Sequence, residues 1–209
     1  MRLYVWGAAP NPRRVKMYLA EKGLSIPTED VGDGAQLSTQ YKGKYPYALV
    51  PMLELDDGTQ IGEAMAICTY FESLHPEPPL MGADAKEKAV VAMWERRAYE
   101  DGILGAAEVF RNSHKAFADR SLAGYADEVP QIEALITRGN QRLRHFFDAF
   151  DRQLAGNEFV AGDRISVADI TALCSVDFAK KLAKVSVPDE YKHLHRWYDM
   201  VSARPSAKV

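Results

Sequence analysis

Apolar residues at the start of the chain fall in short runs on either side of one helical pattern. The run from Leu3 to Trp6 predicts a first strand. Val15 and Leu19 lie at helical spacing and predict a helix over residues 15–22. A second strand is expected over residues 28–31, so the chain opens as a βαβ unit.

The next apolar segments predict a hairpin followed by a helix. After a Gly-rich and polar stretch from Gly32 to Gly43, a strand that follows Val50-Pro51 runs into the turn signal Asp57-Gly58 and returns as a further strand. A helical pattern then covers about residues 64–74. The βαβ and ββα order predicts an α/β domain of thioredoxin type over residues 1–76.

A Pro-rich run, residues 75–79, cannot continue a helix and is the best domain boundary in the chain. From Lys86 onward the pattern is helical almost throughout, with breaks at Gly124, Pro130, residues 156–162 and Pro188. Ser166 and Asp169 have the spacing of a capping box at the start of one of these helices. We therefore expect an all-α C-terminal domain over residues 86–209.

Composition and charge exclude several classes of protein. The chain has 209 residues and 47% hydrophobic content, which is enough to bury a substantial core. Its 26 basic and 29 acidic residues give a net charge of -3, so nothing favours nucleic acid or an anionic membrane as a partner. Cys68 and Cys174 lie far apart without metal-ligand spacing, which indicates neither a disulfide scaffold nor a zinc site. No apolar stretch reaches membrane-spanning length, and we expect an unexported, cytoplasmic protein.

The hairpin carries the most specific chemistry. Pro51 cannot donate to a sheet ladder, so it suggests an edge strand, and its peptide bond could be cis. A cis bond would turn the backbone N–H and C=O of Val50 outward, toward an extended peptide. Glu63 and the free N–H groups of the helix that begins near Ala64 offer a carboxylate for an amine and donors for a carboxylate. Together these groups fit the γ-glutamyl end of glutathione.

This segment resembles the core of the cytosolic glutathione transferase family, with Ala64 in place of the usual Ser. Three further stretches resemble the first helix, the buried capping-box helix and the terminal helix of the family: residues 11–23, 162–169 and 196–205. The resemblance covers the whole chain. It implies that Leu49, Val50, Pro51, Glu63 and Ala64 bind glutathione, with Leu49 standing where the family often has Lys.

The residue that would activate the glutathione sulfur departs from the common classes. Ala9 stands where the serine-type classes have Ser, and Val5 near where the tyrosine-type classes have Tyr. The segment around Asn11 resembles that of the bacterial nu class, whose Asn lies beside the sulfur. An amide N–H could donate to the thiolate there. The alternative is that Asn11 only caps the helix, whereas Tyr4 is expected to be a packing residue of the strand.

Two further features have alternative interpretations. Lys42 and Lys44 lie where the family often keeps a basic residue for the glycine carboxylate, although each could be an ordinary surface lysine. Tyr47 lies where several classes carry an aromatic residue that inserts into the partner subunit, or it could fold against its own loop. The resemblance implies a homodimer.

The function implied is glutathione transfer of the detoxification type: glutathione acts as co-substrate, and its thiolate attacks a small electrophile held against the helical domain, with no metal. Trp94, Tyr99, Leu104 and Phe110 lie on the helices that wall this pocket in the family, or they are ordinary core residues. Two alternatives remain. One is a glutathione-dependent disulfide or peroxide reductase, and the other is a non-catalytic glutathione-binding protein.

Overall fold

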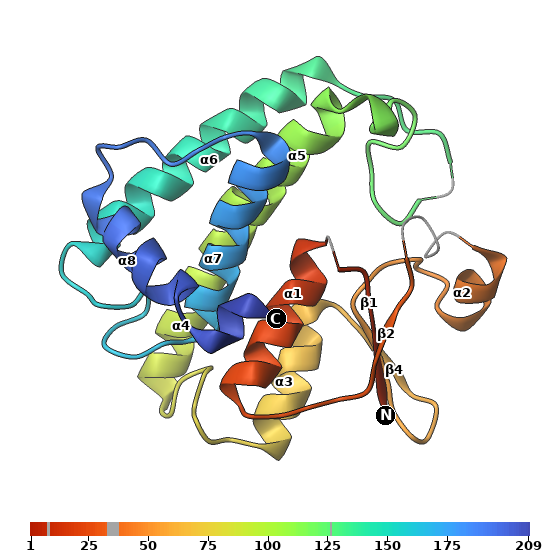
Figure 1. Cartoon of the computed structure of the whole chain (residues 1–209), viewed down its shortest axis with the longest axis horizontal. Coiled ribbons are helices and arrows are strands. Elements are labelled where there is room, and N and C mark those ends of the chain that lie inside the picture. The colour runs from red at the N-terminus through yellow and green to blue at the C-terminus, as the bar shows by residue number, and fades with distance from the viewer. Residues whose placement is uncertain (8, 33–37, 126) are drawn as a thin grey trace.

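A four-stranded sheet forms the N-terminal part of the molecule, shown in Figure 1. The computed structural model describes residues 1–7, 9–32, 38–125 and 127–209. The strands are β1 (Arg2–Val5), β2 (Thr28–Asp30), β3 (Met52–Glu54) and β4 (Gln60–Gly62), in the spatial order β2-β1-β3-β4. Strand β1 is parallel to β2 and antiparallel to β3, and Leu3 lies opposite both Thr28 and Leu53.

The prediction that Pro51 marks an edge strand is wrong. Strand β3 lies between β1 and β4 and pairs with both, and the edges of the sheet are β2 and β4. Pro51 is tolerated because it lies one residue before Met52, outside the paired segment, where no ladder hydrogen bond is needed. The Val50-Pro51 peptide bond is cis.

Helices α1 (Pro10–Glu21) and α3 (Ala64–Leu74) pack against each other beside the sheet, as Figure 1 shows. Helix α3 has the predicted bounds, but α1 begins five residues earlier than the prediction of residues 15–22. The apolar spacing starts only at Val15. Proline is well accommodated in the first turn of a helix, so α1 can begin at Pro10.

Helix α2 (Thr39–Lys44) begins within the Gly-rich and polar stretch of residues 32–43, where no helix was predicted. The Ser38 hydroxyl caps it by accepting from the N–H of Tyr41 at 3.1 Å. Residues 33–37 of the same stretch lie outside the described residues. Tyr41 and Tyr45 pack with Tyr4 and Met52 in a small cluster separate from the main core, which confirms Tyr4 as a packing residue.

Helices make up most of the described chain after α3, so the predicted fold class, an α/β thioredoxin-like domain followed by an all-α domain, is confirmed. Its α-helices are α4 (Ala85–Arg97), α5 (Leu104–Ser113), α6 (Glu133–Leu154), α7 (Val167–Phe178) and α8 (Lys192–Ser202). Two π-helical segments, η2 (Ala98–Ile103) and η4 (Ala179–Ala183), follow α4 and α7, and two 3₁₀ turns are η3 (Lys115–Phe117) and η5 (Pro205–Lys208). Among the described helices, none is long and apolar enough to cross a membrane.

Helix α7 is buried along its whole length at the centre of the helical part. Its start is closed by the predicted capping box, which is confirmed by reciprocal hydrogen bonds between Ser166 and Asp169. The Asp169 carboxylate also accepts from the N–H of Val160 and from Nε1 of Trp197, both at 2.8 Å. This one buried carboxylate therefore joins the start of α7 to a preceding loop and to α8.

Segment η5 lies against α1, so the C-terminal residues complete the N-terminal part of the fold (Figure 1). Arg204 donates two hydrogen bonds to the carboxylate of Glu21, at 2.7 and 2.8 Å, and the Ser206 hydroxyl also donates to that carboxylate. Arg13 pairs with Asp177 of α7 and donates to the C=O of Ala207 at 3.1 Å. Both ends of α1 are thus attached to the helical part.

Candidate functional site

The first turn of α1 exposes few backbone donors. Ala9 is the N-cap residue, and within the described residues it has no side-chain hydrogen bond to the helix. Pro10 and Pro12 have no N–H, and the N–H of Arg13 is directed to the C=O of Ala9 at 3.5 Å. Asn11 consequently supplies the one backbone N–H of this turn that has no partner in the described part of the chain.

The alternative in which Asn11 caps the helix is wrong, because the cap position belongs to Ala9 and Asn11 lies inside the first turn. The side-chain oxygen of Asn11 accepts from Nη1 of Arg14 at 2.9 Å. A guanidinium group only donates, so this bond assigns the amide oxygen to the side of Arg14 and leaves the amide nitrogen, Nδ2, as a donor. No described residue accepts from Nδ2.

Arg14 belongs to a buried polar group that joins α1 to the helical domain. Its Nε donates to the hydroxyl of Thr171 on α7 at 3.0 Å, and Nη2 pairs with the carboxylate of Glu95 on α4 at 2.5 Å. The Thr171 hydroxyl donates in turn to Glu95 at 3.2 Å. The guanidinium also lies 5.2 Å from the ring centre of Tyr99.

The loop before β3 is shaped by Tyr41. Its hydroxyl donates to the C=O of Leu49 at 2.8 Å. The Leu49 side chain packs closely against Gly124, which has a φ of 83° and belongs to the loop after η3. Within the described part of the chain, neither the N–H nor the C=O of half-buried Val50 has a hydrogen-bond partner. The loop therefore leaves this pair available to an extended peptide.

Glu63 lies at the start of α3 in an uncommon backbone conformation. It is the N-cap residue, with φ 63° and ψ 124°, a backbone conformation that residues other than glycine rarely adopt. Its side chain is exposed and makes no capping bond to any described residue. The N–H groups of Ala64 and Met65 also lack partners among the described residues, so they are open to a carboxylate.

The negative charge of Glu63 acts on two tyrosines. Burial raises the pKa of Tyr45, and the negative charges of Glu63 and Tyr47 add to this effect. Burial also raises the pKa of Tyr99, where Arg14 opposes the shift and Glu63 reinforces it. The Tyr45 hydroxyl packs against Gly62, the residue before Glu63, and the Tyr99 ring lies beside the Arg14 guanidinium.

The two candidate lysines differ. Lys44 donates from Nζ to the hydroxyl of Tyr4 at 2.6 Å and to the carboxylate of Glu54 at 2.9 Å. It is therefore already paired, rather than an ordinary solvated lysine. Lys42 is half-buried and has no ion-pair partner among the described residues.

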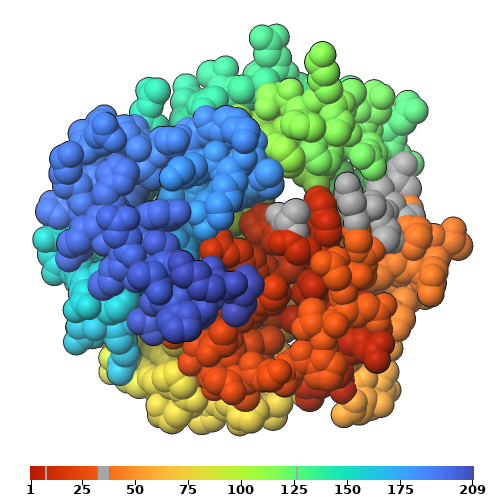
Figure 2. Space-filling view, in the orientation of Figure 1, coloured from red at the N-terminus to blue at the C-terminus, as the bar shows by residue number. Residues whose placement is uncertain are grey.

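The helical domain contains an aromatic cluster around Phe110. The ring of Phe110 on α5 makes edge-to-face or tilted contacts, with ring centres 5.0 Å from Phe117, 5.4 Å from His114 and 5.9 Å from Phe178 at the end of α7. Figure 2 shows the surface hollowed between the red N-terminal segment and the green and blue helical residues. Trp94 instead packs against Phe150 in the core, while Tyr99 and Leu104 are half-buried.

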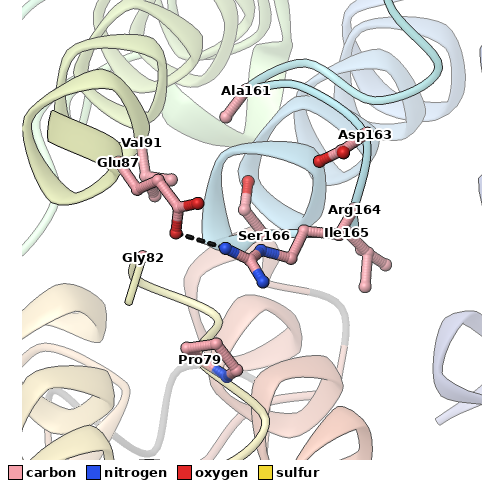
Figure 3. Close-up of a pocket in the computed structure, with 9 residues that line it drawn as sticks. All are labelled: Pro79, Gly82, Glu87, Val91, Ala161, Asp163, Arg164, Ile165 and Ser166. Atoms are coloured by element: carbon pink, nitrogen blue, oxygen red, sulfur yellow. Dashed lines mark hydrogen bonds and ion pairs between the residues drawn. The ribbon is translucent and has the colours of Figure 1, made fainter. Parts of the chain in front are cut away.

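Two pockets that are partly open to solvent lie elsewhere, around the linker between the two parts. The larger has a volume of about 310 Å³ and is lined by Glu21, Pro78, Pro79, Leu80, Arg164, Ile165 and Arg204. The smaller, about 40 Å³, is drawn in Figure 3, where Glu87 and Arg164 point toward each other. Neither cavity is lined by any of the predicted site residues.

The cysteines do not offer a nucleophile. Cys68 and Cys174, both described, are free and buried. Burial raises the pKa of the Cys68 thiol to about 12 and that of Cys174 to about 11, so both remain protonated near neutral pH. Among the described residues, no three His, Cys, Asp or Glu side chains gather as metal ligands.

Sequence reasoning missed the residues that hold the site in place, among them Arg14, Tyr41, Tyr45 and Glu95. Arg14 could have been found, because residues three apart on a helix are neighbours and Arg14 follows Asn11 at that spacing. The contacts of Glu95 and Thr171 with Arg14 join residues far apart in the chain, which no local pattern reveals.

Comparisons with known proteins agree with this architecture. A family model described as the N-terminal domain of glutathione S-transferase matches residues 3–79, and one described as its C-terminal domain matches residues 113–205. Glutathione S-transferase 2 of Saccharomyces cerevisiae is 32% identical over 212 residues, covering 100% of this chain and 88% of that protein.

Solved structures give the same result. A glutathione S-transferase domain-containing protein of Marinobacter aquaeolei VT8 has a TM-score of 0.88 and 36% identity, covering 99% of each chain. Gtt2 from Saccharomyces cerevisiae also has a TM-score of 0.88, with 32% identity, covering 100% of this chain and 99% of that one.

Proposed function

We propose a reaction for this chain from the premise that it belongs to the glutathione S-transferase family and is a glutathione transferase. Reduced glutathione binds on the N-terminal domain, residues 1–76, and its thiolate attacks a small electrophile held against the helical domain, residues 86–209. The observation that carries this proposal is the oriented amide of Asn11, whose oxygen is held by Arg14. The protein would act in the reducing cytoplasm, in a detoxification role.

The peptide part of glutathione would lie along the loop before β3. The N–H and C=O of Val50 pair with the backbone of its cysteinyl residue, while Leu49 and Pro51 shape the loop on either side. The carboxylate of Glu63 takes the γ-glutamyl amine, and the N–H groups that begin with Ala64 take the γ-glutamyl carboxylate. The uncommon backbone conformation of Glu63 supports this role, because such strain persists where a site requires it.

The sulfur would lie at the start of α1. A free thiol with a pKa of about 8.5 is mostly protonated at neutral pH, so the site must favour the anion. Asn11 offers two donors, its backbone N–H and Nδ2, and neither donor can lose its proton to the thiolate. In the reaction the thiol proton passes to solvent and the sulfur forms a bond to the electrophilic carbon. The leaving group departs with the electron pair of the bond that breaks.

The test is the pKa of bound glutathione, followed by thiolate absorbance against pH. Asn11→Ala should raise this pKa by about one to two units, because a hydrogen bond to a charged group contributes about 1.5 to 3 kcal/mol. Asn11→Asp keeps an oxygen for Arg14 but places a negative charge beside the sulfur, so it should raise the pKa further. If the titration curves of both variants coincide with that of the wild type, Asn11 does not stabilise the thiolate.

The choice between reactions needs a second measurement. Relatives named glutathione S-transferase support transfer over disulfide or peroxide reduction. Turnover of an aryl halide, compared with turnover of a small disulfide by the same preparation, decides between them. Reduction of the disulfide without conjugation of the halide would contradict the proposal.

We also propose a homodimer in which Tyr47 contributes to the interface. Tyr47 is 69% exposed, and its ring lies beside that of Tyr45 with ring centres 5.3 Å apart. A central aromatic anchor can contribute at least about 2 kcal/mol to an interface, so Tyr47→Ala should weaken the dimer more than about tenfold in analytical ultracentrifugation. A monomeric wild type at micromolar concentration would refute the dimer, whereas an unaffected mutant dimer would refute only the role of Tyr47.

A further inference from the structure

We infer that Arg14 is a positioning residue that fixes the polarity of the Asn11 amide and so decides whether the site attracts or repels a thiolate. The inference rests on the proposed function, since it assumes that Asn11 lies beside the sulfur. It assigns the orientation of that amide to contacts with the helical domain.

Arg14 is held more firmly than an ordinary helix side chain. It is 3% exposed, and its three nitrogens donate to three different elements: Nη1 to Asn11 on α1, Nε to Thr171 on α7 and Nη2 to Glu95 on α4. The hydroxyl of Thr171 closes the group by donating to Glu95. A planar guanidinium with partners in three directions has little freedom to turn.

The consequence for Asn11 follows from hydrogen-bond chemistry. An amide has a donating end and an accepting end of nearly the same shape, and rotation by half a turn exchanges them. Arg14 can only donate, so it binds the oxygen and turns Nδ2 away from itself. Without Arg14 the amide could present its oxygen to the sulfur, which would disfavour the anion.

Orientation, rather than the charge of Arg14, carries the effect. The carboxylate of Glu95 lies 2.5 Å from Nη2 and opposes the positive charge at the same place. The ring of Tyr99 covers the guanidinium at 5.2 Å. At the sulfur site the charges of Arg14 and Glu95 therefore nearly cancel. The amide of Asn11 is the group through which Arg14 acts.

Arg13 provides a matched control on the same turn. It also joins α1 to α7, through an ion pair with Asp177 at 2.5 Å. Its other hydrogen bond goes to the C=O of Ala207, and it has no hydrogen bond to Asn11. Arg13→Met therefore removes a contact between the two domains without releasing the amide.

The experiment compares the thiol pKa of bound glutathione in charge-balanced variants. Arg14→Met combined with Glu95→Met removes both buried charges together, which avoids leaving one of them unpaired. This pKa should rise by about one to two units, as in Asn11→Ala, and adding Asn11→Ala should raise it no further, because both changes remove the same interaction. Arg13→Met should leave the pKa at the wild-type value.

Arg14→Lys serves as a second variant in case the double variant does not fold. It keeps a cation opposite Glu95 but lacks the fork that reaches three acceptors, so the thiol pKa should again rise. Glu95→Gln keeps an acceptor for Nη2 while leaving the charge of Arg14 unopposed. If the thiol pKa of bound glutathione stays at the wild-type value, Arg14 acts by orienting the Asn11 amide. A lowered pKa would overturn the inference, because it would show that the charge of Arg14 acts directly on the sulfur.

The results separate failure of this inference from failure of the proposed function. If Asn11→Ala shifts the thiol pKa while both Arg14 variants keep the wild-type value, Arg14 does not position the amide and the proposed function stands. If Asn11→Ala itself shifts nothing, the role of Asn11 in the proposed function fails. If Arg13→Met shifts the thiol pKa as much as the Arg14 variants do, the effect of Arg14 comes from general contact between the domains and not from the Asn11 amide.

Discussion

Helices α1 and α7 begin in opposite ways, although they pack against each other. At the start of α7, Ser166 and Asp169 exchange hydrogen bonds, and the carboxylate of Asp169 is fully occupied by donors. At the start of α1, Ala9 offers no side chain that could cap, and the donors of Asn11 have no partner in the described part of the chain. The closed start stabilises the fold, whereas the open start is available to a ligand.

Helix α3 extends the comparison. Its N-cap residue, Glu63, has an exposed side chain that makes no capping bond to any described residue, and the following N–H groups lack partners among the described residues. The open starts of α1 and α3 thus differ from the closed start of α7 and from that of α2, which Ser38 caps. We therefore expect substitutions at the closed starts to change the stability of the fold, and substitutions at the open starts to change glutathione binding.

The largest effect is expected for Asp169→Ala. The change leaves buried donors of Val160, Ser166 and Trp197 without an acceptor, so the free energy of unfolding should fall by about 3 to 5 kcal/mol, the range for breaking a buried charged network. Urea denaturation measures it. Asp163→Ala, an exposed carboxylate six residues earlier, is the control and should change stability by less than about 0.5 kcal/mol. Equal losses in the two variants would refute the closed-start interpretation.

A smaller effect, on binding rather than stability, is expected for Glu63→Ala. Loss of a hydrogen bond to the charged amine should weaken glutathione binding by about 1.5 to 3 kcal/mol in calorimetry. Glu63→Gly should weaken binding as well, yet stabilise the free protein, because glycine adopts the positive φ of this position without strain. Glu158→Ala, another exposed carboxylate, is the control. Unchanged affinity in both Glu63 variants would exclude this residue from the site.

The smallest effect is expected for Ala64→Ser, which adds a hydroxyl at the first residue of α3. Binding of glutathione should tighten by about 0.5 to 1.5 kcal/mol, the contribution of one neutral hydrogen bond. Calorimetry at one pH, with wild type alongside, is sufficient. An absence of any gain would mean that another group already holds the γ-glutamyl carboxylate.

The sequence was a good guide wherever local pattern determines structure. The bounds of α3 follow from its apolar spacing, and the capping box of α7 follows from two residues three apart. Helix α2 was missed because its polar residues show no apolar period, and its evidence is the Ser38 cap alone. The interior place of β3 was missed because Pro51 restricts only its own position and leaves the next residue free to pair on both sides.

The candidate site shows the same limit. Asn11 and Glu63 were found by motif, yet the features that give them chemistry are long-range contacts and backbone angles. The amide of Asn11 is oriented through Arg14, whose partners Glu95 and Thr171 lie far along the chain. The positive φ of Glu63 has no sequence signal, since glutamate rarely adopts it.

The attachment of residues 204–208 to α1 has a consequence for synthesis on the ribosome. Helix α1 is synthesised well before its partners in this attachment, because Arg204 follows Glu21 by 183 residues and Ala207 follows Arg13 by 194. Domains commonly fold as they are translated, the N-terminal one first. Here α1 waits for residues that are made 183 or more residues later, so the nascent N-terminal part keeps one flank of this helix uncovered until residues 204–208 have been synthesised.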